Sequence, residues 1–367
     1  MIAPPEFASI MTPQLVVDVP RLRRNVAHVA ADLSTIGISL RPHFKTSKSL
    51  EVARLQRAAG AHGFTAATPS EAAVLLAGGM DTVLLAHQPV GPAKVGFVVD
   101  HAAEGLLVAL DSVPVAGPLA QQAVAAGRTV DFLLEVNTGH ARAGVDPEDA
   151  ARVAAELTVL PGIRLRGVMT HEGHLATHGS DRAALEAAGR AAAALLVEVS
   201  RELRDAGHDM SIVSTGSTPG LTSAARMAGL TEARPGTYVY FDANQVRLGS
   251  ATLAECALTV LARVVSVERP GTAIIDAGLK AMSSDALTPD NGAGLVCAPT
   301  GEPLPDVTFP AANEEHGFLT GDGTRDLRVG DLVRVVPNHA CGTVNMWSNA
   351  LAADDTSTSR WQILARH

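Results

Sequence analysis

Short apolar runs alternate with longer alanine-rich segments over the first two thirds of the chain. Eight runs have the character of strands, at residues 38–40, 63–66, 82–86, 106–110, 130–136, 164–169, 210–214 and 237–241. Segments with helical spacing separate most of them, at residues 21–33, 47–59, 70–78, 115–126, 147–157 and 181–206. Eight strands with intervening helices predict a (β/α)8 barrel. An open doubly wound sheet is the alternative, but no G-x-G-x-x-G motif follows a first strand.

The pattern changes after about residue 250. Strand-like runs joined by Gly, Pro and Asp turns lie at residues 258–267, 272–276, 294–297, 316–319, 331–336 and 360–365. This texture predicts a β domain, and the early strand at 12–19 is expected to join it. The predicted fold is therefore α/β. A TIM-like barrel covers residues 21–248, and a C-terminal antiparallel β domain combines residues 1–20 and 249–367.

Composition narrows the class of protein. The 367 residues fit a barrel of about 250 residues plus a smaller domain. A net charge of −9 argues against a nucleic-acid or anionic-membrane partner, and no apolar run reaches the roughly 18 residues of a membrane span. The N-terminus lacks a signal-peptide pattern. Three cysteines without tight spacing make a disulfide framework unexpected, so a cytoplasmic location is predicted.

The segment RPHFKTSK at residues 41–48 places a lysine, Lys45, between a predicted strand and a predicted helix. A lysine at the carboxyl end of a barrel strand faces the mouth where the chemistry of such barrels lies. A lone lysine is more often exposed on the surface. The pattern P-H-x-K-T, which includes His43, is similar to the start of the alanine racemase-type (fold type III) pyridoxal phosphate enzymes. In those enzymes this lysine carries the cofactor as a Schiff base.

Two loops could hold a phosphate. The loop STGSTPG at residues 214–220 follows a late strand, and its small residues can present N–H and hydroxyl donors to an anion. The loop PGTY at residues 235–238 follows one strand later. Either loop alone is usually a plain turn. Two at adjacent strands favour a phosphate site, because barrels commonly bind phosphate there.

Two other loops carry candidate side chains. Arg142 in VNTGHARAGV could lie under a cofactor ring or form an ordinary surface salt bridge. His171 and His174 flank Glu172 after another strand, which makes them candidates for a base or a hydrogen-bond donor.

The motif PNHACGTVN contains His339 and Cys341, an imidazole and a thiol that suit Zn²⁺. At a strand end, residues two apart would point the same way. Two protein ligands are too few for a structural zinc site, but they leave positions open for Lewis-acid chemistry. The alternative is a buried cysteine beside an unrelated histidine.

The motifs TPQLVVDV, RPHFKTSK, VNTGHARAGV, STGSTPG, RPGTYVY, DAGLKA and PNHACGTVN occur in this order. Together they resemble the D-serine dehydratase/D-threonine aldolase group of fold type III enzymes over nearly the whole chain. The resemblance implies pyridoxal 5′-phosphate on Lys45 and a divalent metal on His339 and Cys341, with Zn²⁺ first and Mn²⁺ or Mg²⁺ as alternatives. It implies His171 in the substrate pocket and a homodimer. The implied cofactor-binding residues are Lys45, His43, Arg142, Thr215, Gly216, Ser217, Thr218, Gly236, Thr237 and Tyr238.

The resemblance also implies a lyase that acts on D-3-hydroxy amino acids. Lys45 would remove the Cα proton and the metal would bind the 3-hydroxyl, giving a 2-oxo acid and ammonia. The alternative is retro-aldol cleavage to glycine and an aldehyde. Aldolases of the group usually have Asp as the second metal ligand and eukaryotic-type D-serine dehydratases have Cys, so Cys341 favours dehydration.

Two further hypotheses about function have less support from the sequence. Racemisation needs a base on each face of the cofactor, classically a tyrosine opposite the lysine. The two tyrosines, Tyr238 and Tyr240, both lie in the predicted barrel. A non-catalytic pyridoxal phosphate carrier resembles the small one-domain relatives of this fold, which lack a C-terminal β domain.

Overall fold

The computed structural model describes residues 7–283, 292–355 and 357–366. The chain forms two compact units. The β unit comprises Met1–Val26, Thr46–Glu51 and Thr237–His367, and the barrel unit comprises Ala27–Lys45 and Val52–Gly236. The predicted domains have other boundaries: 21–248 for the barrel, and 1–20 plus 249–367 for the β domain. These boundaries remain a prediction.

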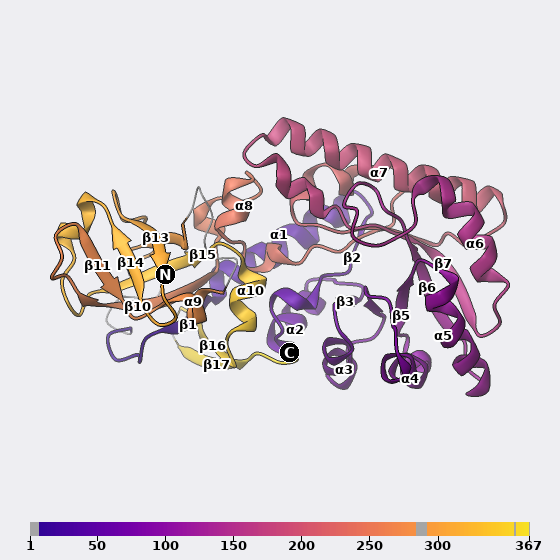
Figure 1. Ribbon diagram of the computed structural model, residues 1–367, viewed down its shortest axis with the longest axis horizontal. Coiled ribbons are helices and arrows are strands. Elements are labelled where there is room, and N and C mark those ends of the chain that lie inside the picture. The colour runs from indigo at the N-terminus through magenta and orange to yellow at the C-terminus, as the bar shows by residue number, and fades with distance from the viewer. Residues whose placement is uncertain (1–6, 284–291, 356, 367) are drawn as a thin grey trace. The chain divides into compact units, whose positions relative to one another are not determined.

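The barrel unit is built on eight parallel strands, and Figure 1 shows several of them surrounded by helices. The strands are β2 (Ser39–Leu40), β3 (Phe64–Ala66), β4 (Val83–Leu85), β5 (Leu107–Leu110), β6 (Val130–Glu135), β7 (Ile163–Met169), β8 (Ile212–Thr215) and β9 (Glu232–Ala233). Their order is β2-β9-β8-β7-β6-β5-β4-β3, and a parallel bridge between His43 and Thr65 joins the two ends. The predicted (β/α)8 barrel is confirmed.

Helices follow most of the strands. They are α1 (Val19–Thr35), α2 (Leu50–Ala58), α3 (Pro69–Ala77), α4 (Pro92–His101), α5 (Val113–Ala125), α6 (Ala150–Thr158) and α7 (Arg182–Asp205), whereas α8 (Ala243–Arg247) belongs to the β unit. Local capping explains where some begin: the side chain of Thr68 accepts from the N–H of Glu71 before α3, and Asp181 accepts from Ala184 before α7. None of the helices in the described part of the chain has the length and apolar character that crossing a membrane requires.

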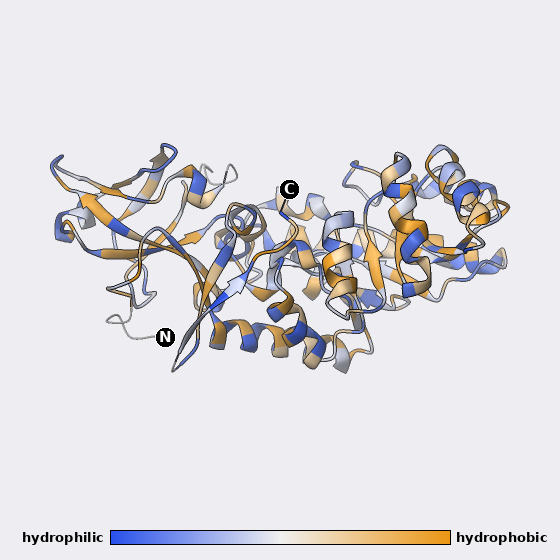
Figure 2. Ribbon diagram, turned by 90° about the horizontal axis from the view of Figure 1, so that it is seen from below, coloured by the Kyte–Doolittle hydropathy of each residue, from blue (hydrophilic) through white to orange (hydrophobic). Residues whose placement is uncertain are grey.

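The interior of the barrel unit is apolar. Strands such as β4 and β5 are buried on both faces, so they appear in the sequence as continuous hydrophobic runs rather than alternating ones. Figure 2 shows hydrophobic strands and helices of mixed hydropathy. One buried cluster contains Leu84, Leu107, Ala109, Leu133 and Met169.

The predicted eighth strand at 237–241 is wrong. Thr237–Val239 forms a 3₁₀ helix, and the N–H groups of Tyr240 and Phe241 both donate to the carbonyl of Thr237, at 3.0 and 2.7 Å. The eighth strand is β9, two residues long, and it begins with the buried Glu232. A strand this short and partly charged gives no apolar run that a sequence pattern could detect.

The β unit holds a nine-stranded sheet within the described residues. Its strands are β1 (Gln14–Asp18), β10 (Leu258–Ser266), β11 (Thr272–Ile275), β12 (Gly294–Cys297), β13 (Thr308–Ala312), β14 (Gly317–Thr320), β15 (Leu332–Pro337), β16 (Asn349–Ala353) and β17 (Thr358–Gln362). The path is β13-β14-β11-β10-β1-β16-β17, with β15 pairing β10 and β12. Two short helices, α9 (Leu279–Met282) and α10 (Ala340–Asn345), also belong to this unit.

The first strand of the chain lies in this sheet, as predicted. It pairs antiparallel with β10 but parallel with β16, so the predicted β domain is confirmed, and its mostly antiparallel sheet is mixed. A parallel pair needs a long connection between its strands. The whole barrel unit lies between β1 and β16 in the chain and provides that connection.

Candidate active site

Lys45 lies just beyond the carboxyl end of β2. The chain leaves β2 through His43, whose N–H donates to the carbonyl of Pro235 at 3.0 Å, and enters the 3₁₀ helix Phe44–Thr46. The N–H of Lys45 lies 3.4 Å from Nδ1 of His43. Burial, followed by the positive charges of Lys45 and its neighbours, holds the pKa of His43 well below its usual value. The carboxyl edge of the barrel therefore concentrates positive charge around a neutral imidazole.

His171 follows β7 on the same edge. Its Nδ1 lies 2.5 Å from the carbonyl oxygen of Gly216, and its ring meets that of His140 edge to face at 5.5 Å. Burial and the nearby charge of Lys45 lower the pKa of His171 to about 3. A neutral ring that donates Nδ1–H to the carbonyl leaves Nε2 free to accept a proton or a hydrogen bond.

Acid is expected to destabilise the protein partly through His171. In the unfolded chain the pKa of a histidine is about 6.5, whereas the folded value for His171 is about 3. Between these values the unfolded state binds a proton that the folded state does not, so stability is lost as pH falls through this window. We expect urea unfolding to show a smaller loss from about pH 7 to pH 5 for His171→Asn than for the wild type. An equal loss would contradict a neutral buried ring.

Several of the predicted phosphate-binding groups already form hydrogen bonds within the protein. The hydroxyl of Thr215 donates to the carboxylate of Glu172, and the N–H of Gly216 lies 3.1 Å from the same carboxylate. The hydroxyl oxygen of Ser217 accepts from the N–H of Gly220 at 3.1 Å. Sequence reasoning named Glu172 only as a companion of two histidines and missed its contact with this loop.

The other predicted cofactor residues lie in different surroundings. Thr218 is buried in the same loop, and Gly236 ends the barrel unit. Thr237 and Tyr238 belong to the β unit, as does Tyr240, so the expectation of two barrel tyrosines does not match this division. Both tyrosines are buried, and burial raises the pKa of Tyr240.

Arg142 makes a partly exposed ion pair. Its guanidinium lies 3.6 Å from the carboxylate of Glu135, with 52% of the arginine side chain exposed and 6% of the glutamate side chain. This contact corresponds to the salt-bridge alternative. A place under a cofactor ring stays a prediction, and half of the side chain is accessible for it.

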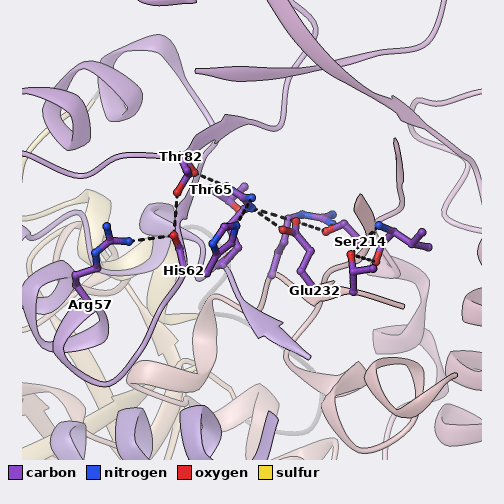
Figure 3. Close-up of polar contacts among 10 residues, drawn as sticks. Arg57, His62, Thr65, Thr82, Ser214 and Glu232 are labelled. Carbon is purple, nitrogen blue, oxygen red and sulfur yellow. Dashed lines mark hydrogen bonds and ion pairs between the residues drawn. The ribbon is translucent and has the colours of Figure 1, made fainter. Parts of the chain in front are cut away.

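A buried polar network crosses the barrel interior and was missed from the sequence (Figure 3). Arg41 pairs with Glu232 at 2.9 Å, with side chains 2% and 3% exposed. The hydroxyl of Ser214 donates to Glu232 at 2.6 Å and accepts from Arg234, which also donates to the carbonyl of Thr170 at 2.6 Å. The network thus ends one residue before His171.

The charges in this network depend on one another. Burial alone would raise the pKa of Glu232, but the charge of Arg41 and the Ser214 hydroxyl hold that pKa below its usual value. Burial lowers the pKa of Arg234, which Glu232 opposes. Each buried ion is therefore stabilised by partners that are distant in sequence.

Glu232→Gln is expected to destabilise the protein by about 3–5 kcal/mol, because it leaves the buried Arg41 without its counter-charge. The matched control is Glu156→Gln, which breaks a surface pair with Arg152 whose side chains are 46% and 59% exposed. Such a pair contributes about 0–1 kcal/mol. Denaturant unfolding of both variants measures the difference, and similar small losses would contradict a strongly coupled buried pair.

The segment with His339 and Cys341 is a helix start rather than a strand end. Strand β15 ends at Pro337, His339 is the N-cap of α10, and Cys341 lies in the first turn of that helix. The prediction that both side chains point the same way along a strand is therefore wrong, because the strand ends before the motif. The sulfur of Cys341 lies 3.1 Å from the hydroxyl of Thr46.

Asp242 fixes this turn. Its carboxylate accepts from the N–H of Ala340 and from the N–H of Gln245, both at 2.9 Å. Burial raises the pKa of Asp242 to about 6, which the nearby His339 opposes. A buried carboxylate thus ties α8 to the segment that carries the two predicted metal ligands.

Comparisons with known proteins agree with the motifs. The sequence matches the model "Alanine racemase, N-terminal domain" over residues 17–244 and the model "Putative serine dehydratase domain" over residues 257–353. The chain belongs to the alanine racemase-like family. This confirms the family that the motifs predicted. The C-terminal match agrees with the predicted D-serine dehydratase/D-threonine aldolase group.

Relatives and solved structures of this family match the whole chain. D-threo-3-hydroxyaspartate dehydratase from Delftia sp. (strain HT23) is 37% identical over 96% of this chain and 97% of its own. D-threonine aldolase from Arthrobacter sp. is 30% identical over 98% and 94%. The solved structure of the Delftia dehydratase has a TM-score of 0.92, with 98% of both chains covered.

The cofactor that the family implies fits the barrel unit. Lys45, Arg234 and Arg142 all contribute to lowering the pKa of His43, so the carboxyl edge has the positive potential that an anionic cofactor needs. Gly216 lies close to this charge: a Cβ there would be 2.8 Å from Nη2 of Arg234. The absence of a side chain therefore keeps the loop open beside a buried guanidinium.

The metal that the family implies fits the donors of the β unit. Imidazole and thiol groups at His339 and Cys341 suit a zinc-like ion. Asn345 lies one helical turn after Cys341, on the same face, and its Oδ1 is buried without a hydrogen-bond partner among the described residues. No group of three or more His, Cys, Asp or Glu side chains that could hold a metal occurs in the described ranges. The metal site would thus have few protein ligands.

Proposed function

We propose that this protein is a lyase of D-3-hydroxy amino acids that depends on pyridoxal 5′-phosphate and a divalent metal, and that it eliminates water to give a 2-oxo acid and ammonia. One observation carries the proposal. Thr46, whose hydroxyl lies 3.1 Å from the sulfur of Cys341, is the residue that follows Lys45. The residue next to the proposed cofactor lysine in the sequence therefore contacts a proposed metal ligand within the β unit.

Lys45 is the residue proposed to hold the cofactor and to move the Cα proton. The bound cofactor supplies an electron sink for the negative charge left at Cα. Positive charge around Lys45 and the neutral His43 favour an anion at this edge of the barrel. The other proposed cofactor contacts are Arg142, Thr215, Gly216, Ser217, Thr218, Gly236, Thr237 and Tyr238.

His339 and Cys341 are the residues proposed to hold the metal, with Zn²⁺ first and Mn²⁺ or Mg²⁺ as alternatives. The metal supplies Lewis-acid stabilisation of charge on the 3-oxygen of the substrate. A solved structure of a D-threo-3-hydroxyaspartate dehydratase with a cysteine-to-alanine change is in the metal-free form, and another carries a histidine-to-alanine change. The two substituted residues are two positions apart, as are His339 and Cys341.

Retro-aldol cleavage is the second candidate function, because a D-threonine aldolase also matches the whole chain. In that reaction the neutral His171 could accept the proton of the 3-hydroxyl, since its Nε2 is free while Nδ1 faces Gly216. Dehydration is favoured because the dehydratase from Delftia is more similar, at 37% against 30% identity. Cys341 also favours dehydration, because aldolases of the group usually have Asp as the second metal ligand.

Product analysis separates the two functions. The zinc-loaded, cofactor-loaded protein is given D-threo-3-hydroxyaspartate, D-serine and D-threonine in separate reactions. Dehydration predicts oxaloacetate, pyruvate and 2-oxobutanoate, each with one equivalent of ammonia. Cleavage predicts glycine with glyoxylate from the first substrate and glycine with acetaldehyde from D-threonine. Glycine without ammonia would overturn the proposed dehydration.

Two further parts of the proposal concern the cell and the assembly. We propose a homodimer, which the family resemblance implies, and a cytoplasmic location, which the few, widely spaced cysteines favour. Light scattering of the purified holoenzyme measures the mass, and a value of one chain at micromolar concentration would contradict the dimer.

A further inference from the structure

The hydroxyl of Thr46 contacts the sulfur of Cys341 at 3.1 Å, and Thr46 is fully buried. We propose that this hydroxyl donates a hydrogen bond to the metal-bound sulfur and thereby sets both the affinity and the electronic character of the metal site. Thr46 is on this account a positioning residue that acts through Cys341. The inference rests on the metal role of Cys341 in the proposed function.

Chemistry decides the direction of this hydrogen bond. A thiol and a hydroxyl can each donate, but a cysteine that binds a metal is a thiolate and has no proton to give. The Thr46 hydroxyl must then be the donor. Hydrogen bonds to a cysteine sulfur withdraw charge from it and tune the metal, and partners outside the ligand set also orient the ligand.

The backbone holds Thr46 in place from one side. Two residues later, the carbonyl of Lys48 accepts from the N–H of Leu364 at 2.7 Å, and Nζ of Lys48 donates to the carbonyl of Ala365 at 2.8 Å. Lys48 also adopts a left-handed conformation, with φ of 47°. The short segment Thr46–Glu51 is thus fixed to the C-terminal end of the chain, within the same β unit.

Cys341 is held from the other side. The Asp242 carboxylate accepts from Ala340, and the carbonyl of His339 accepts from the N–H of Thr343 at 3.1 Å. The hydroxyl of Thr343 donates to the carbonyl of Met282 at 2.6 Å. Because both partners are anchored independently, the contact between Thr46 and Cys341 has a fixed geometry and is suited to orient the sulfur.

The test compares Thr46→Val, which keeps the shape but removes the hydroxyl, with Thr46→Ser, which keeps the hydroxyl. Zinc affinity is measured on the holoenzyme by competition with a chromophoric chelator. We expect Thr46→Val to bind Zn²⁺ about tenfold more weakly, at the lower end of what such outer partners contribute. Thr46→Ser is expected to restore wild-type affinity.

Cobalt substitution gives a second measurement that a purely structural role would not change. Removing the donor leaves more charge on the sulfur, so the sulfur-to-cobalt charge-transfer band of Co²⁺-loaded Thr46→Val should move to lower energy. Thr46→Ser should keep the wild-type band. Thr324→Val is the matched control, because it removes another buried threonine hydroxyl of the β unit, which donates to the carbonyl of Gly321 and contacts neither the sulfur nor the residues that hold Cys341. Its band should not move.

The inference is overturned if Thr46→Val keeps the wild-type affinity and spectrum, or if Thr46→Ser behaves like Thr46→Val. Thr46→Ala serves as the hydroxyl-free variant if valine prevents folding, and circular dichroism checks each variant. Cys341→Ala distinguishes a failure of this inference from a failure of the proposed metal role. If it loses zinc while Thr46→Val does not, this inference alone fails; if it keeps zinc, the proposed metal role fails as well.

Discussion

Lys45→Ala is expected to abolish turnover and the visible absorbance of the bound cofactor together. The lysine is proposed to hold the cofactor and to act as the base at Cα. A positioned base alone contributes about 10²–10⁴-fold to a rate, so the loss should be at least about 10⁴-fold when the covalent attachment is lost too. Absorbance spectroscopy and a product assay on the same sample measure both effects.

The chain has so few lysines that each of them can be tested as the site of cofactor attachment. The sequence has four lysines, Lys45, Lys48, Lys94 and Lys280. Borohydride reduction of the holoenzyme followed by peptide mapping should place the cofactor on Lys45 and leave the other three unmodified. Lys280→Ala, at a side chain 62% exposed, should keep absorbance and activity. Cofactor on Lys48, or retained absorbance in Lys45→Ala, would contradict the assignment.

Cys341→Ala and His339→Ala are expected to lose metal and activity in parallel. Lewis-acid stabilisation by a bound metal is worth several kcal/mol, so activity should fall by at least about 10²-fold. Metal analysis after gel filtration and the product assay measure the two losses. Chelation of the wild type should give the same fall, and addition of Zn²⁺ should reverse it.

The two other cysteines are controls for the metal prediction. Cys256 and Cys297 are buried in the β unit, and burial raises the pKa of Cys297 to about 11. Neither is a candidate ligand, so Cys297→Ala should retain a full complement of metal. Full activity of the chelated wild type, or an equal loss of metal from Cys297→Ala and Cys341→Ala, would refute the metal role.

Features that depend on local pattern could be predicted from the sequence. Seven of the eight proposed barrel strands overlap strands of the structure, because strands buried on both faces produce continuous apolar runs. The early strand was assigned to the β unit correctly. The eighth strand was misplaced because β9 has two residues and includes a charged one. The strands β13 and β16 were not predicted.

Features that depend on contacts between residues far apart in the sequence could not be predicted from it. Arg41 and Glu232 are 191 residues apart in the sequence, and Thr46 and Cys341 are 295 apart. No spacing rule connects such residues, although each one lay inside or beside a motif that was recognised. The loop motif at Thr215 was predicted to face a phosphate, but its contact with Glu172 becomes visible only when β7 and β8 lie side by side.

The central claim is that the protein removes the 3-hydroxyl from Cβ and releases the amino group as ammonia. The fate of the substrate nitrogen tests this claim most directly. The holoenzyme is given ¹⁵N-labelled D-threo-3-hydroxyaspartate, D-serine and D-threonine, and each reaction is followed by nitrogen-edited NMR. The account predicts that the label appears as ammonium. Label in glycine would mean retro-aldol cleavage. Label in the Cα-inverted amino acid, a diastereomer of D-threo-3-hydroxyaspartate or D-threonine that NMR distinguishes from the substrate, would mean racemisation. Unchanged substrate in all three reactions would contradict the proposed activity.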